Sequence, residues 1–230
     1  MKSDMELVEK LTRETASTIS LYLRNSRRFR ILEERYFKAV PSYHVRFLDK
    51  QSFLTFTIIV SLKCNISKRH FITLSCNTLE DARMFIGYKI KKPRNVKECY
   101  EISERVRCIV YRLFDFDINN FVKYCLRVIG ESKNYNIVFK LLEYLEELSE
   151  KYELTFECYY TLLHDTFNIE VRHVSGVVFN LKIYDSVVRL SFDETFEMKS
   201  FDIIVLKTVI DICIEVIECL KQIGLITEFS

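Results

Sequence analysis

The residues best suited to bind a ligand are arginines and lysines that gather in two places in the first half of the chain. One cluster lies within twelve residues and consists of Arg24, Arg27, Arg28, Arg30 and Arg35. The other lies in a short polar segment and includes Lys91, Lys92 and Arg94. A guanidinium group donates two parallel hydrogen bonds to a phosphate, and lysines add positive charge. The two clusters therefore predict a surface that binds the phosphates of a nucleic acid.

The segment between the two clusters supports the same expectation. It has no acidic residue between Asp49 and Glu80, and its cations include Lys68 and Arg69. Alternating apolar and polar residues predict three strands with one polar face, over 43–48, 53–62 and 69–76. We expect the polar face to lie against phosphates, with Phe53 and Phe71 adding stacking surface if they point outward. The alternative is that these aromatic residues belong to the core and that the basic loops only keep this half in solution.

The sequence offers little support for catalysis or metal binding. The four glycines stand alone, which excludes the glycine-rich loops that hold nucleotide phosphates. None of the eight cysteines forms a C-x-x-C pair, so a zinc ribbon is not expected. His164–Asp165 matches a dipeptide of metal-dependent phosphohydrolases, but it lies at the end of an expected strand. We expect no enzymatic activity, no organic cofactor and no bound metal.

The two halves of the chain show the same order of expected elements. Each has a helix, an antiparallel meander of three or four strands, and one or more further helices. The clearest meander runs from Phe167 to Phe192, with a hairpin turn at Ser175–Gly176. In the first half, Thr78 is expected to open a short helix after the last strand. The pattern predicts an α+β protein of two similar units, residues 1–130 and 131–230, consistent with a tandem duplication.

The two halves also differ in charge. Residues 1–115 contain 23 Lys and Arg against 13 Asp and Glu, a net charge of +10. Residues 116–230 contain 11 basic against 19 acidic residues, a net charge of −8. Such a split predicts a basic binding surface on the first half, or attraction between the halves. We expect the arginine cluster to be solvated and to contribute little to stability.

The element order resembles that of the RWD family of interaction domains, which occur in tandem in some scaffolding proteins, and it is similar to that of type III secretion chaperones. The Y-P-x-x-x-P turn of RWD domains is absent, because the two prolines are Pro41 and Pro93. The resemblance implies a scaffold whose acidic second half meets a protein partner. The leading hypothesis is non-catalytic binding of DNA or RNA through the basic N-terminal half, and the protein-interaction scaffold is the alternative.

The C-terminal helix, expected from about Ser200 to Ile223, has too many apolar residues for one narrow stripe. Either it lies centrally between the two sheets or it completes its burial in a homodimer. Charged residues interrupt it, and no apolar run reaches the length of a membrane span. The first residues lack the apolar core of a signal peptide. We therefore expect a cytoplasmic protein without a membrane partner.

Overall fold

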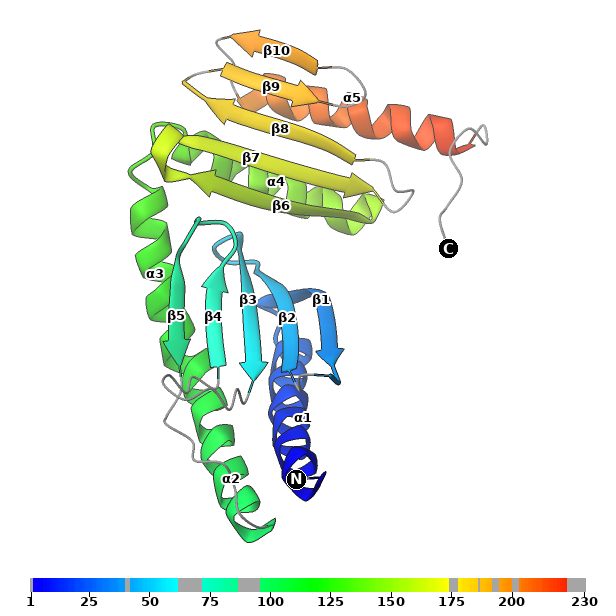
Figure 1. Cartoon of the computed structure of the whole chain (residues 1–230). Coiled ribbons are helices and arrows are strands. Elements are labelled where there is room, and N and C mark those ends of the chain that lie inside the picture. The colour runs from blue at the N-terminus through cyan, green and yellow to red at the C-terminus, as the bar shows by residue number, and fades with distance from the viewer. Residues whose placement is uncertain are drawn as a thin grey trace. The chain divides into compact units, whose positions relative to one another are not determined.

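The computed structural model arranges the chain around two antiparallel sheets (Figure 1). It describes residues 2–39, 42–61, 72–86, 96–173, 178–185, 187–191, 195–199 and 203–222. The chain divides into two units, the first formed by Met1–Asn77 with Asp81–Leu126 and the second by Thr78–Glu80 with Arg127–Ser230. Each unit holds one five-stranded sheet whose strands follow one another in chain order. The expected α+β architecture of two similar units is confirmed.

The first unit begins with a long helix and continues into the meander. Its elements are α1 (Lys2–Asn25), β1 (Phe29–Phe37), β2 (Ser42–Asp49), β3 (Leu54–Ser61), β4 (Ile72–Cys76), β5 (Arg83–Ile86), α2 (Val96–Arg112), the π-helical turn η1 (Leu113–Asp117) and α3 (Ile118–Ile129). Alternate residues of the strands, such as Phe47, Phe56 and Leu74, are buried because successive side chains of a strand point to opposite faces. Helices α1 and α3 cover the buried face (Figure 1).

The expected short helix after β4 is wrong. Leu79 forms an isolated bridge with Tyr160, and residues 80–81 form a turn in which Asp81 has a positive φ of 60°. The chain then enters β5, which pairs with β4 from Ile72 opposite Ile86 to Ser75 opposite Arg83. A left-handed residue ends any helical turn at this point and allows the chain to reverse. The residues after this turn therefore add a fifth strand, β5, to the sheet.

Strand β1 carries a β-bulge. Its pairing with β2 shifts between Ile31 and Glu33, so Leu32 has no cross-strand partner. An extra residue of this kind bends a strand and increases its local twist. Strand β1 is also an edge strand, with β2 as its neighbour on one side.

The π-helical turn η1 lets two helical segments bury the same side. Val110, Phe114, Ile118 and Val122 are buried and follow one another in steps of four. An α-helix has 3.6 residues per turn, so a run of such steps would carry the apolar side progressively around the helix axis. A single π turn holds one residue more than an α-helical turn, so the buried side chains after it point in the same direction as those before it. Helices α2 and α3 thus remain one continuous rod whose buried side keeps its direction from Val110 to Val122.

The second unit repeats this order with a helix on either end of its meander. Its elements are α4 (Tyr135–Tyr152), β6 (Leu154–Thr161), a 3-10 turn (Leu162–His164), β7 (Thr166–His173), β8 (Val178–Tyr184), β9 (Val187–Ser191), β10 (Thr195–Lys199) and α5 (Ile203–Gln222). Phe156, Ile169, Leu181 and Val188 are buried on one face of the sheet. Helices α4 and α5 cover one face of this sheet (Figure 1). The expected turn at Ser175–Gly176 lies outside the described residues.

None of the described helices combines the length and the apolar character needed to cross a membrane.

Candidate functional site

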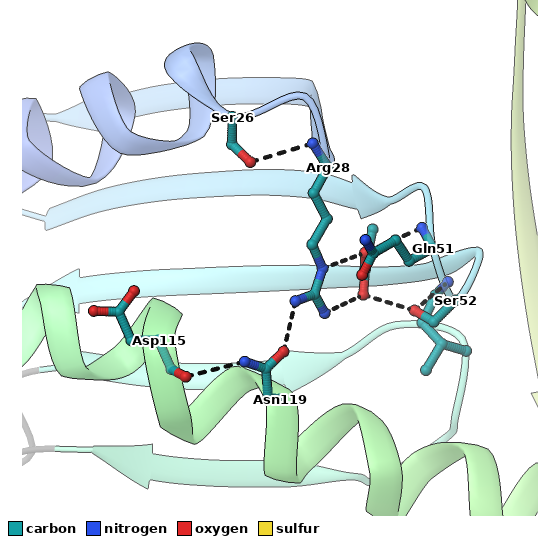
Figure 2. A network of polar contacts seen from close by, with 8 residues as sticks. Ser26, Arg28, Gln51, Ser52, Asp115 and Asn119 are labelled. Atoms are coloured by element: carbon teal, nitrogen blue, oxygen red, sulfur yellow. Dashed lines mark hydrogen bonds and ion pairs between the residues drawn. The ribbon is translucent and has the colours of Figure 1, made fainter.

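The first arginine cluster contains one side chain that is built into the fold. Arg28 donates from Nε to Asp49 Oδ1 at 2.8 Å and from Nη2 to Asp49 Oδ2 at 2.7 Å. Its Nη1 donates to Asn119 Oδ1 at 2.5 Å. Figure 2 shows this guanidinium reaching from the start of β1 towards Asn119 on α3 and towards the turn of Gln51 and Ser52. Arg28 therefore ties together three segments that are far apart in the sequence.

The carboxylate that receives Arg28 is fully buried and has further donors. Asp49 has an exposed fraction of 0%. The Ser52 hydroxyl donates to its Oδ2 at 2.9 Å, and the Gln51 backbone N–H donates to its Oδ1 at 3.2 Å. The side-chain hydrogen bond with Asp49 raises the pKa of Arg28, although burial opposes the shift. Because a buried charge is tolerated when it is paired and hydrogen-bonded, this is a structural ion pair. The expectation that the whole cluster is solvated is wrong for Arg28.

The other arginines of the cluster have different surroundings. Arg24 is exposed and donates from Nη2 to Glu34 Oε2 at 2.6 Å. Arg35 is exposed and forms an ion pair with Glu33. Arg27 is exposed in the connection between α1 and β1 and makes no polar contact with a described residue, while Arg30 is half-buried. Much of the positive charge of the cluster is thus matched by carboxylates of the same unit.

Glu34 is the centre of a small polar network at the surface. Burial raises the pKa of this carboxyl, but hydrogen bonds from Ser20, Tyr43 and Arg24 outweigh burial, and the net shift is downward. The Tyr43 hydroxyl donates to Glu34 Oε1 at 2.7 Å, and the Ser20 hydroxyl donates to the same oxygen at 2.5 Å. Glu34 is consequently held as an anion that keeps Arg24 beside it.

The remaining residues of the expected phosphate surface are not brought together by the described structure. Lys68, Arg69, Lys91, Lys92, Arg94 and Phe71 lie outside the described residues. Phe53 lies in the turn between β2 and β3 with a φ of 55° and is half-exposed. A shared face for the two basic clusters therefore stays a prediction.

The His164–Asp165 dipeptide has a structural setting. Asp165 follows the 3-10 turn with a φ of 43°, and its Oδ1 accepts a hydrogen bond from the Tyr160 hydroxyl at 3.1 Å. His164 is exposed, and its carbonyl accepts a hydrogen bond from the Thr166 hydroxyl at 3.0 Å. These contacts close the turn between β6 and β7. Within the described part of the chain, no three His, Cys, Asp or Glu side chains gather in a way that would hold a metal ion.

A groove of about 1030 Å³ lies between α1 and α2 of the first unit. Its lining residues are Glu6, Glu9, Lys10, Arg13, Glu14, Ser17, Thr18, Leu21, Tyr22, Asn25 and Ser26 from α1 and the residue that follows it, and Arg107 and Tyr111 from α2. The α1 residues recur every three or four positions and so form one continuous stripe of the helix. Leu11, Ile19 and Leu23 lie on the other side of α1 and are buried.

The two ends of the groove differ in chemistry. At one end, Leu21 is 62% exposed and Tyr111 is 55% exposed. The Tyr22 ring, which also lines the groove, stacks on Phe114, with ring centroids 4.2 Å apart, and its hydroxyl donates to Asp115 Oδ1 at 3.1 Å. This end therefore presents apolar surface next to a stacked aromatic pair. Large exposed apolar side chains that lie next to one another mark interaction sites more often than isolated ones do.

The other end of the groove is charged but balanced. Arg13 Nη2 lies 2.7 Å from Glu9 Oε1, and Lys10 Nζ lies 3.9 Å from Glu14 Oε1. Three of the lining residues are acidic and three are basic, namely Glu6, Glu9, Glu14, Lys10, Arg13 and Arg107. The electrostatic potential along such a rim is neither strongly positive nor strongly negative. The rim suits a ligand that itself carries both charges.

Sequence reasoning did not find this groove. The helical pattern of α1 indicated which of its residues are apolar, but it gave no information about which helix lies beside them. The signal that was present is the run of small residues Ser17 and Thr18 next to Leu21, which leaves space along one side of the helix.

Comparison with known proteins gives no significant match to this chain, whether to a protein-family model, a curated protein or a solved structure.

Proposed function

We propose that the N-terminal unit is a non-catalytic binding module that holds an amphipathic helix of a protein partner in the groove between α1 and α2. The observation that carries the proposal is that two large exposed apolar side chains, Leu21 of α1 and Tyr111 of α2, both line the groove. Helices commonly bind by laying an apolar face into such a groove. The proposal shares a protein partner with the interaction scaffold that the sequence offers as its alternative, but it places that partner on the first unit, whereas the alternative expected the acidic second half to meet it.

The dimensions and charge of the groove favour a helical protein segment. Its lining runs along α1 from Glu6 to Ser26, and twenty residues at 1.5 Å each give a length of about 30 Å. An apolar side chain of the partner would lie between Leu21 and Tyr111, where burial of apolar surface is most favourable. The balanced rim would pair with a helix of mixed charge, whereas a polyanion would meet as many carboxylates as cations.

The proposal is tested by selection from a displayed library of helical peptides of about 16 residues, a length that spans most of the groove. We expect the wild-type protein to enrich sequences with apolar residues at positions i, i+4 and i+7. Fluorescence anisotropy of an enriched peptide should show at least tenfold weaker binding to Leu21→Glu and Tyr111→Glu, which corresponds to about 1.4 kcal/mol. Phe85→Glu is the matched control, because Phe85 is an exposed apolar residue on β5.

Two outcomes would count against the groove. One is a selection that enriches no helical pattern. The other is an enriched peptide that binds Leu21→Glu and the Phe85→Glu control equally well.

The second candidate function is binding of DNA or RNA through the basic N-terminal half. It is favoured by the net charge of +10 over residues 1–115 and by exposed Arg27 in the connection after α1. Anisotropy with single-stranded and duplex oligonucleotides should then show log affinity falling linearly with log salt, since phosphate contacts release counterions. Replacing Arg24 and Arg27 by Ala should make the salt dependence of the affinity shallower. Replacing Lys91, Lys92 and Arg94 by Ala as well should make it shallower still. Absence of binding at about 50 mM salt would remove this candidate.

We also propose that the protein is cytoplasmic. Cys76, Cys125 and Cys158 are buried and take part in no disulfide bond, and a reducing compartment keeps cysteines in this state.

A further inference from the structure

The outer side of α5 carries an apolar stripe. Ile204 is 70% exposed and Ile212 is 54% exposed. Thr208, which is also exposed, lies midway between them, four residues from each. Residues at this spacing are neighbours on one side of a helix. Ile210 and Ile214 lie on the opposite side of α5 and are buried in the second unit.

Three polar residues on or beside the stripe, Lys207, Thr208 and Asp211, already make contacts inside the unit. The Tyr144 hydroxyl of α4 donates to Asp211 Oδ1. Lys207 Nζ lies 4.4 Å from the centre of the Tyr144 ring, a cation–π contact. The Thr208 hydroxyl donates to the Ile204 carbonyl at 2.9 Å. Because its hydroxyl is hydrogen-bonded to the backbone, the part of Thr208 that is exposed between the two isoleucines is small and largely apolar.

We propose that α5 pairs with α5 of a second copy of this chain, antiparallel, with the two helices crossing at Thr208. A symmetric dimer needs a patch that complements itself. The order Ile204, Thr208, Ile212 reads the same from both ends, so an antiparallel crossing places Ile204 of one copy against Ile212 of the other. The small side chain at the crossing point lets the two helices approach closely.

Charge and helix dipoles select the antiparallel arrangement. Glu215 is exposed and continues the stripe towards the C-terminus of α5. A parallel pair would bring the two Glu215 carboxylates together, whereas the antiparallel pair separates them. Two helix dipoles that lie side by side also attract when they run in opposite directions. The dimer does not depend on the groove, which belongs to the other unit.

Sedimentation velocity of the full chain from about 1 to about 100 μM tests the dimer, a range that covers weak association. Wild type should shift from monomer to dimer over this range. Ile204→Lys alone and Ile212→Glu alone should each weaken the dimer at least tenfold. The double variant Ile204→Lys/Ile212→Glu should restore it, because each Lys then faces a Glu of the second copy. Phe85→Lys, which changes an exposed apolar residue of the first unit, should leave the dimer unchanged.

Cysteine cross-linking gives a second and independent test of the register. Thr208→Cys should form an intermolecular disulfide under mild oxidation, with wild type as the background for the native cysteines. Glu215→Cys should not, because the two residues would lie about 21 Å apart along the helix pair. A wild type that stays monomeric to about 100 μM would overturn the dimer. A double variant no more dimeric than the single variants, or efficient cross-linking at position 215, would overturn the antiparallel register.

Discussion

Arg24 lies in the last turn of α1 with 65% of its side chain exposed, whereas Arg28, four residues later, lies against buried Asp49. Both form ion pairs with a carboxylate at similar distances. Their contributions differ because water screens the first pair and is excluded from the second. The same residue type therefore serves solubility at one position and the joining of β1, the β2–β3 turn and α3 at the other.

Replacing Arg28 should reveal this difference. We expect Arg28→Ala to lower the free energy of unfolding by about 3–5 kcal/mol, because the Asp49 charge would remain buried without its cation. Arg24→Ala removes the same charge at the surface and should cost less than about 1 kcal/mol. Urea unfolding measured by circular dichroism at neutral pH compares the two. Equal losses would contradict the structural role of Arg28.

The sequence could predict where the arginines lie along the chain but not which of them is buried. Arg24, Arg27 and Arg28 have similar neighbours in sequence, and Asp49 and Asn119 are distant from all three. A buried ion pair is formed by residues that only the tertiary fold brings together. The groove was missed for the same reason, because Leu21 and Tyr111 belong to helices separated by five strands.

At the scale of elements, the continuous rod of α2, η1 and α3 depends on one extra residue. The sequence pattern predicted further helices after the first meander, and η1 (Leu113–Asp117) lies where α2 ends and α3 begins. The strong strands were also predictable from their alternation. Strands β5 and β10 were not, because each has only four or five residues, too few for alternation to stand out.

Two single-residue deletions test the role of η1. Phe116 is an exposed residue of the π turn. Deleting it should convert the turn into regular α-helix, and the apolar sides of α2 and α3 should still face the same way. Deleting exposed Asn120 from α3 should destabilise the protein by at least about 3 kcal/mol, since Asp117 would occupy the buried place of Ile118. Urea unfolding of the two deletion variants gives the comparison. If Phe116 deletion cost as much as Asn120 deletion, the phase argument would fail.

At the scale of the whole molecule, each unit contains a tyrosine whose ionisation is opposed by the fold. In the first unit, burial and the hydrogen bond to Glu34 raise the pKa of Tyr43. In the second, burial and the hydrogen bond to Asp165 raise the pKa of Tyr160 to about 12. The folded state thus keeps both phenols neutral at a pH where the unfolded chain begins to release their protons.

The free energy of unfolding should therefore fall as the pH rises from about 10, the value of an unperturbed tyrosine, to about 12. Below about pH 10 the contribution of these tyrosines is fully present. Tyr160→Phe should lose about 1 kcal/mol at pH 8 through the missing hydrogen bond to Asp165. It should also show a shallower decline above pH 10 than wild type in urea unfolding at a series of pH values. A decline as steep as that of wild type would show that Tyr160 does not contribute.

The β-bulge at Leu32 has a consequence for how copies of this protein behave when they are crowded together. An edge strand with free backbone groups is a template on which another chain can add a strand, and long regular edges promote amyloid-like stacking. In β1 the bulge breaks the regular spacing of those groups, and Glu33, Glu34 and Arg35 follow it directly. An incoming strand would meet both a bend and a row of charges. The first sheet thereby resists growth from this edge, and copies that meet there remain separate instead of aggregating.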